Sequence, residues 1–473
     1  MTLIFHNHSF QYETERLFRS FFPPVKITLS DNPDDARGEY CLTSRKQTES
    51  GILLSVSLCA EGKQLDRAET VPADTPDKEQ ERVLSVLLYR VLEEFTGITP
   101  PWGILTGVRP VKLLAGMSPR EAEQKLLVNP QKLALARRIS EVQEPLVAAI
   151  PERSFSLYVS IPFCPTRCSY CSFVSHSVDK AAGLVDDYLD KLITEIKQTA
   201  DIAGQLGLRL DTVYFGGGTP TTLSAEQLKR LFAALDDFDR STVREFTVEA
   251  GRPDTITREK LLAIKEAGAE RISVNPQTMR DSVLSAVGRR HTAAQTEEAY
   301  SLAREVGFSC INMDLIAGLP TDDAEGFKRS LDRVCELAPE NITVHSLSLK
   351  RAAALFHEQD RELRGGAAEM IDYTHKTLAE KGYIPYYLYR QKNTADNREN
   401  TGYAKPGTES LYNMYIMEEL QTILAVGAGA STKLVDAKGG RITRLANFKY
   451  PYEYIDRFNE IEFQKKSIFD FFV

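Results

Sequence analysis

From residue 154 onwards, short and nearly continuous apolar runs alternate with longer stretches in which apolar residues recur at helical spacing. Such runs are typical of the buried strands of a parallel sheet, and the longer stretches are typical of its crossover helices. The pattern predicts six strands, at 155–161, 211–215, 245–249, 271–275, 308–315 and 341–348. Six β/α units predict an open, partial (β/α)6 barrel of the α/β class.

Two of the predicted helices begin with a recognisable capping sequence. Ser224 and Thr292 are each followed three residues later by a glutamine, Gln227 and Gln295. A hydroxyl and an amide at this spacing satisfy the free N–H groups of a helix start in both directions. We therefore expect helices to begin at these two points.

The chain before the barrel has a different pattern. Apolar, β-prone runs at 25–29 and 52–58 precede a helical pattern over 79–95, which predicts a small α+β domain over 1–98. The Pro-Pro-Trp-Gly sequence that follows interrupts this helix, and a mostly helical connecting segment is predicted for 99–150. The predicted barrel then covers 151–350, and the alternation stops in a C-terminal region at 351–473.

Composition excludes several classes of protein. The chain has 473 residues, of which 42% are apolar and 26% charged, a profile typical of a globular protein with more than one domain. The net charge of −8 argues against a general nucleic-acid binder. The N-terminus does not resemble a signal peptide, and no run of about 18 apolar residues predicts a membrane span. We expect a cytoplasmic protein.

Three of the seven cysteines are clustered, and the other four are scattered through apolar stretches, where a cysteine is usually a small buried hydrophobe: Cys41, Cys59, Cys310 and Cys335. Cys164, Cys168 and Cys171 form a C-x3-C-x2-C motif directly after the first predicted barrel strand. Three thiolates on one loop can bind three irons of a [4Fe–4S] cluster and leave the fourth iron open. A zinc site is the alternative, but zinc motifs usually have a second C-x2-C pair, which this sequence lacks.

Polar residues recur at the ends of the next strands. The second strand runs into Gly216-Gly217-Gly218-Thr219-Pro220, and Glu249, Gln277 and Asp314 lie near the ends of three later strands. Any one of them alone is more often a turn or capping residue. Because the carboxyl ends of parallel strands share one edge of a barrel, their recurrence predicts a common site there.

The segment from Tyr158 to Cys171 resembles the cluster loop of radical S-adenosylmethionine enzymes, with the aromatic Tyr170 before the third cysteine. Tyr158 resembles the cluster-side tyrosine of the oxygen-independent coproporphyrinogen III oxidase group. The stretches 389–393, 402–407 and 425–431 are similar to the coproporphyrinogen dehydrogenase branch of that group, and to its HemZ type in particular. The resemblance also implies a C-terminal extension like that of HemN.

This resemblance implies two cofactors, a [4Fe–4S] cluster and S-adenosylmethionine. It implies that the three cysteines bind the cluster and that Gly217, Gly218 and Thr219 contact the methionine amino group. Glu249 and Asp314 then correspond to contacts with ribose and methionine. Gln277 and Arg289 correspond to positions around the adenosyl group, although Arg290 is an alternative to Arg289.

The reaction implied is the oxidative decarboxylation of coproporphyrinogen III. A radical derived from S-adenosylmethionine would remove a hydrogen atom from the β-carbon of a propionate, and loss of carbon dioxide and one electron would leave a vinyl group. Two such steps would give protoporphyrinogen IX. The resemblance also implies an electron donor such as flavodoxin or ferredoxin. Four basic residues are candidates to bind the substrate carboxylates: Arg390, Lys392, Arg398 and Lys405.

The sequence departs from this group at one position. Well-known oxidases continue the motif as C-x3-C-x2-C-x-C, whereas Phe173 stands here in place of the fourth cysteine. The related haem chaperones, which bind and transfer haem, share this departure. Two alternatives therefore remain beside the decarboxylase: a haem chaperone, and a radical enzyme acting on another tetrapyrrole. His176 and His345 do not discriminate, because a lone histidine is usually structural.

Overall fold

The computed structural model describes residues 1–22, 26–173, 176–348, 350, 353–357, 366–391, 394–436 and 440–472. The chain forms two compact units, 1–140 and 141–473. This division falls within helix α5 (Pro130–Ala148). The finer limits at residues 98, 150 and 350 stay predictions. Among the described residues, no helix is both long and apolar enough to cross a membrane.

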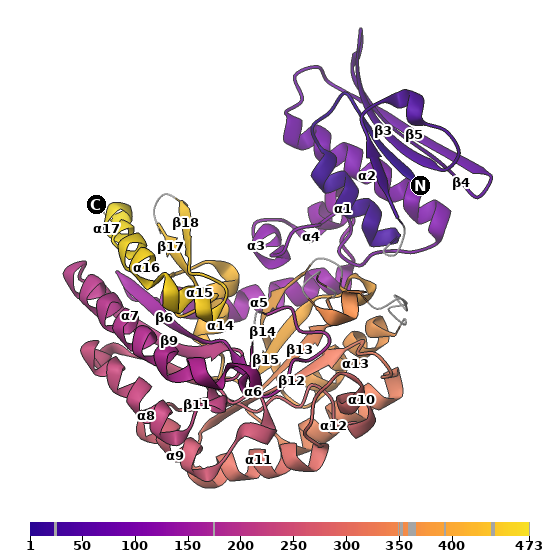
Figure 1. Ribbon diagram of the computed structural model, residues 1–473. Helices are drawn as coiled ribbons and strands as arrows, with labels where there is room; N and C mark the ends of the chain where they lie inside the picture. The colour runs from indigo at the N-terminus through magenta and orange to yellow at the C-terminus, as the bar shows by residue number, and fades with distance from the viewer. Residues whose placement is uncertain are drawn as a thin grey trace. The chain divides into compact units, whose positions relative to one another are not determined.

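Unit 1–140 is a five-stranded sheet with two long helices (Figure 1). Its strands, in the order β2-β1-β3-β4-β5, are β2 (Thr28–Ser30), β1 (Thr2–His6), β3 (Tyr40–Thr48), β4 (Gly51–Ala60) and β5 (Lys63–Val71). The helices are α1 (Gln11–Phe21), α2 (Asp77–Thr96), α3 (Pro110–Leu114) and α4 (Pro119–Leu126). The helix predicted over 79–95 is confirmed as α2. The first predicted β run, 25–29, is only partly a strand, because β2 begins at Thr28; residue 25 lies outside the described part of the chain.

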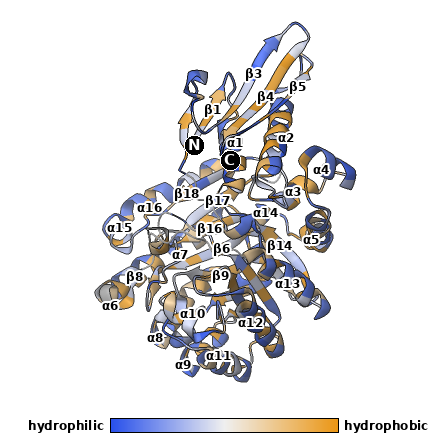
Figure 2. Cartoon of the chain, turned by 90° about the vertical axis from the view of Figure 1, so that its right-hand side faces the viewer, coloured by the Kyte–Doolittle hydropathy of each residue, from blue (hydrophilic) through white to orange (hydrophobic). Residues whose placement is uncertain are grey.

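The six predicted barrel strands form consecutive parallel neighbours in an eleven-stranded sheet. They are β6 (Ser154–Ile161), β9 (Arg209–Gly217), β10 (Glu245–Glu249), β11 (Arg271–Ser273), β12 (Cys310–Ala317) and β13 (Asn341–Ser346). The main helices that follow them are α7 (Val185–Gln205), α8 (Ala225–Ala233), α9 (Arg258–Glu266), α11 (Ala293–Val306) and α12 (Ala324–Leu337). Helices α8, α9 and α11 carry hydrophilic and hydrophobic stripes, because one face of each packs on the sheet (Figure 2).

Both predicted capping boxes are present. The Ser224 hydroxyl accepts a bond from the N–H of Gln227, whose amide oxygen accepts in turn from the N–H of Ser224, at 3.1 and 2.9 Å. Thr292 and Gln295 make the same pair of bonds at the start of α11. These boxes fix where the crossover helices begin.

The C-terminal region adds strands at both ends of the same sheet. On one side β15 (Asn400–Ala404) runs antiparallel to β13, and β14 (Ile384–Tyr389) is the outermost strand. On the other side β16 (Thr422–Val426) pairs parallel with β6, followed by β17 (Ser431–Val435) and β18 (Ile442–Ala446). The helices of this region are α13 (Ala367–Glu380), α14 (Leu411–Glu418), α15 (Pro451–Asp456), α16 (Phe458–Lys465) and α17 (Ser467–Phe472).

Candidate functional site

The cysteine loop follows β6 at the carboxyl edge of the barrel. It is held by a short parallel pair, β7 (Phe163–Cys164) with β8 (His176–Ser177), and by a bond from the Ser169 N–H to the Val287 carbonyl at 3.1 Å. Burial is the main cause that raises the pKa of the Cys171 thiol to about 11, and the nearby Cys168 and Cys164 add to the rise. The loop therefore brings the three predicted thiols close to one another.

The three thiols are the donor set of the candidate site. Within the described ranges, no three His, Cys, Asp or Glu side chains converge on one metal position. All three cysteines are free of disulfides, and Cys168 is the buried one. A cubane takes each thiolate on a different iron, so it needs thiols that are neighbours without meeting at one point. Three thiolates on one loop are a donor set that a [4Fe–4S] cluster takes.

The glycine segment after β9 connects the cysteine loop to the barrel wall. Gly217 has φ +107°, and a Cβ on Gly218 would lie 2.6 Å from the Phe163 carbonyl oxygen. The Thr219 hydroxyl lies 3.5 Å from the Sγ of Cys164. Close packing against the loop thus requires these glycines, which supports a tight turn and does not by itself indicate a ligand.

Two carboxylates lie close together on the barrel wall, Glu249 of β10 and Asp314 of β12. The Tyr214 hydroxyl donates to Glu249 at 2.5 Å, and the Asn312 amide donates to Asp314 at 2.7 Å. Burial is the main cause that raises the pKa of Glu249 to about 7, and Asp314 raises it further. The His345 Nε2 lies 3.8 Å from the Asp314 carboxylate. The site therefore contains an acidic pair with a histidine beside it.

Asp314 lies deeper in the barrel than the sequence pattern predicts. Strand β12 extends beyond residue 315 to Ala317, because its pairing with β13 continues as far as Ser346. Asp314 therefore lies further from the end of its strand than predicted. Its carbonyl accepts a bond from the N–H of Gln277 at 2.8 Å, and Gln277 has φ +68°, a conformation that non-glycine residues rarely adopt. This contact connects two of the predicted site residues.

Three tyrosines line the wall beside Glu249. Tyr158 and Tyr214 are paired across β6 and β9, and Tyr214 stacks on Tyr412 with the ring centroids 4.3 Å apart. Tyr412 is held in place by Glu245, whose carboxylate accepts from the Tyr412 N–H at 3.2 Å. Of the three, only Tyr158 is predicted from the sequence. Tyr412 is far away along the chain, so no local pattern could have identified it.

Arg289 is buried and lies close to the cysteine loop, whereas Arg290 is exposed. The Arg289 guanidinium donates to the carbonyl oxygens of Asn275 and Gly251 at 2.6 and 3.1 Å. Burial lowers the pKa of Arg289, but Tyr170, Cys168 and Asp254 act in the other direction and together raise this pKa above its ordinary value. The structure thus favours Arg289 over Arg290 as the site residue. Arg289 also holds the backbone of the turn before Gln277.

The side-chain oxygen of Asn275 is a buried acceptor with no hydrogen-bond partner among the described residues. It lies at the same edge as Gly251, where a Cβ would approach the Asn275 amide nitrogen to 3.3 Å. Buried polar atoms normally find a partner, so an unpaired acceptor at the barrel edge fits a polar ligand. The thiols, the acidic pair and this acceptor together fit a cluster with a polar cofactor beside it.

The structure separates the four basic residues predicted to bind carboxylates. Lys405 pairs with Glu340 at 3.8 Å, at the edge where β13 begins, because β15 runs antiparallel to β13. It therefore does not reach the site, and that prediction is wrong. Arg398 pairs with Asp372 of α13 at 3.2 Å. Arg390 is half-buried directly after β14, and Lys392 lies outside the described residues.

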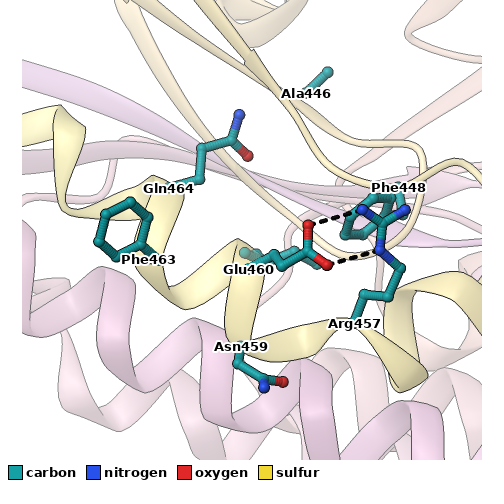
Figure 3. Close-up of a pocket in the computed structure, with 8 residues that line it drawn as sticks. Ala446, Phe448, Arg457, Asn459, Glu460, Phe463 and Gln464 are labelled. Carbon is teal, nitrogen blue, oxygen red and sulfur yellow. Dashed lines mark hydrogen bonds and ion pairs between the residues drawn. The ribbon is translucent and has the colours of Figure 1, made fainter.

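A hollow between β18 and the C-terminal helices lies apart from these residues (Figure 3). Arg457 lies over the Phe448 ring at 4.0 Å and pairs with Glu460 at 2.8 Å. None of the residues that line the hollow is a predicted site residue. The candidate site is therefore the carboxyl edge of the barrel.

The chain is similar to known proteins over most of its length. The family model of the Radical SAM superfamily matches residues 158–334. The chain is 40% identical over 442 residues to the oxygen-independent coproporphyrinogen-III oxidase-like protein HemZ of Bacillus subtilis, covering 89% of this chain and 88% of that one. It is 33% identical to the heme chaperone HemW of Bacillus subtilis, over 64% of this chain and 75% of the chaperone.

A solved structure has the same fold. Coproporphyrinogen III oxidase (HemN) from Escherichia coli aligns with a TM-score of 0.54 and 26% identity, over 68% of this chain and 73% of that one. Proteins of the superfamily use a [4Fe–4S] cluster and S-adenosylmethionine. With its barrel and its near full-length similarity to HemZ, the chain belongs to the radical SAM superfamily, among the oxygen-independent coproporphyrinogen III oxidase-like proteins.

Proposed function

We propose that this protein decarboxylates two propionate side chains of coproporphyrinogen III and so forms protoporphyrinogen IX without oxygen. The main support is the extent of the similarity to HemZ, which covers 89% of the chain, whereas the similarity to the HemW chaperone covers 64%. Haem biosynthesis in the cytoplasm is the process we assign to it.

In this proposal Cys164, Cys168 and Cys171 bind the cluster and leave one iron open to S-adenosylmethionine. When bound, these cofactors supply a carbon radical that takes a hydrogen atom from the β-carbon of the propionate. The protein positions the reactants and excludes water. Loss of carbon dioxide then leaves one electron, which a terminal acceptor must take, and a protein such as flavodoxin or ferredoxin would supply the first electron to the cluster.

The barrel wall would bind S-adenosylmethionine. Glu249 and Asp314 offer carboxylate oxygens to its ribose and amino groups, and Gly217, Gly218 and Thr219 offer backbone groups. Gln277 would contact the adenosyl group, and Arg289 would act through the turn that it holds at Asn275. Tyr158 and Tyr170 would pack on the cluster side. Arg390 and Lys392 stay candidates to bind a substrate carboxylate, whereas Arg398 pairs with Asp372.

A haem chaperone is the second candidate. Phe173 stands where the oxidases have a fourth cysteine, and its side chain is 67% exposed directly after the cysteine loop. An exposed aromatic side chain at that place suits the binding of a planar ligand or partner. The similarity to HemW supports the same alternative.

Anaerobic turnover separates the two candidates. The reconstituted protein is incubated with reductant, S-adenosylmethionine and coproporphyrinogen III, and the products are separated by chromatography. We expect protoporphyrinogen IX together with 5′-deoxyadenosine, no product from Cys171→Ala, and normal product from Cys59→Ala, whose cysteine lies outside the site. Absence of 5′-deoxyadenosine, with stoichiometric binding and transfer of haem, would instead identify a chaperone.

A further inference from the structure

A buried arginine lies behind the cysteine loop. Arg252 follows β10, is 3% exposed, and its Nη1 lies 3.7 Å from the Sγ of Cys168. Its Nε and Nη2 donate to the two carboxylate oxygens of Asp254, each at 3.0 Å. Both Nη atoms reach the Thr166 hydroxyl, at 3.1 and 3.0 Å. The guanidinium is therefore fixed in one orientation toward the thiol.

Two buried guanidinium groups lie near one of the three thiols, that of Cys168. Cys168 is the buried thiol and has Arg252 beside it, and the second buried guanidinium, that of Arg289, is close enough for Cys168 to raise its pKa. The Thr219 hydroxyl donates to Cys164, and Arg167 is close enough to Cys171 to act on its pKa in the lowering direction. The loop thus places its cysteines in unequal electrostatic surroundings.

We propose that Arg252 is a positioning residue that sets the reduction potential of the cluster through its charge on Cys168. This inference rests on the proposed role of Cys168 as a cluster ligand and is independent of the substrate. Reduction adds a negative charge to the cluster, and a buried cation near a ligating sulfur stabilises that charge more than solvent does. Hydrogen bonds to the ligating sulfurs act in the same direction.

The negative charge of Asp254 partly offsets the positive charge of Arg252, and the same carboxylate holds the arginine in place. Its carboxylate is paired with Arg252, and His291 lies behind it with Nδ1 at 3.8 Å from Oδ1. Burial, with Arg289 and Arg252 adding to it, lowers the pKa of His291 to about 3, so the imidazole is neutral. Removal of the Asp254 charge therefore leaves the surroundings of Cys168 more positive, whereas removal of the Arg252 charge leaves them more negative.

The midpoint potential of the anaerobically reconstituted protein, measured by redox titration followed by electron paramagnetic resonance, tests this inference. For Arg252→Gln we expect the equilibrium constant of the one-electron reduction to fall about tenfold. The midpoint potential is then about 59 mV more negative than that of the wild type. Arg252→Lys should retain part of the wild-type potential, and Asp254→Asn should shift it in the positive direction. The control is Arg258→Gln, which removes an exposed arginine paired with Glu305 and should change nothing.

Opposite shifts in Arg252→Gln and Asp254→Asn are the signature of charge, since a loosened loop would move both variants in the same direction. An unchanged potential in Arg252→Gln at full iron content would overturn the inference, as would shifts of the same sign. If Arg252→Gln does not fold, Asp254→Asn and Arg252→Lys decide the question by the sign and size of their shifts. A wild-type protein that holds no cluster would contradict the proposed ligands instead.

Discussion

At the scale of single residues, Glu249 is a carboxyl with a raised pKa beside a second acid on the barrel wall. Its carboxylate accepts a bond from Tyr214, yet burial and the neighbouring Asp314 raise its pKa to about 7. The folded protein therefore holds a proton that the unfolded chain releases between about pH 4.5 and pH 7. The contribution of this carboxyl to stability is complete below the ordinary pKa and is lost as the pH rises through about 7.

Glu249→Gln should remove this pH dependence, because glutamine stays neutral and still accepts from Tyr214. We expect the variant without cofactors to be more stable than the wild type by about 1 kcal/mol near pH 8, and to gain little stability near pH 5. The value at pH 8 is discounted because the side chain is partly exposed. Thermal unfolding at both pH values measures the difference. Glu298→Gln, on the exposed face of α11, is the matched control; an equal gain at both pH values would contradict the assignment.

The sequence predicted those site residues that stand at the end of a predicted strand or in a recognisable motif. Glu249 and Gln277 lie near strand ends and the cysteines form a motif, so their proximity follows from the barrel. Tyr412 could not be predicted in the same way, because its place beside Tyr214 depends on Glu245 holding the start of α14. Arg252 was also missed, since an arginine in a strand-end loop is usually a solvated side chain.

At the scale of elements, the six barrel strands were predictable and the strands that complete the sheet were not. Apolar runs and capping boxes are local signals, and they identified β6 and β9–β13. Strand β16 pairs with β6, which lies far from it along the chain, and β15 runs antiparallel. Neither pairing leaves a local pattern in the sequence, so the strands after residue 350 could not be predicted from it.

The turn after β16 explains how that strand is fixed to β6. Gly427 has φ +93°, and a Cβ there would lie 2.6 Å from the Ser160 carbonyl oxygen and the Tyr188 hydroxyl. Its N–H donates to the buried Glu195 of α7 at 2.7 Å, and the Tyr454 hydroxyl donates to the same carboxylate at 2.5 Å. One carboxylate on a barrel helix thus holds two parts of the C-terminal region.

Gly427→Ala should therefore destabilise the unit 141–473. Overpacking and a positive φ together predict a loss of about 1–3 kcal/mol in the free energy of unfolding. Gly204→Ala, within α7 and with no atom near the added Cβ, should instead be neutral or stabilising by about 0.5–1 kcal/mol. Urea titration of both variants measures the contrast, and a Gly427→Ala variant as stable as Gly204→Ala would contradict the packing described.

At the scale of the whole molecule, each of the two units has a main hydrophobic core of its own. In unit 1–140, α1 and α2 pack on the sheet around residues such as Phe18, Leu54 and Leu88. In unit 141–473, the core continues from the barrel helices to the C-terminal helices, from Leu157 through to Ile468. Because these two clusters share no residue, we expect each unit to unfold cooperatively.

Separate cores predict two unfolding transitions in the full chain, which calorimetry can resolve. Leu88→Ala removes a fully buried side chain from the core of unit 1–140 and should cost that unit about 2–5 kcal/mol, so that one transition moves to lower temperature. Leu331→Ala makes the matched change in α12 and should move the other transition alone. A single transition lowered by both variants would mean that the two units unfold as one, because a cavity in one core can destabilise the other only if the two unfold together.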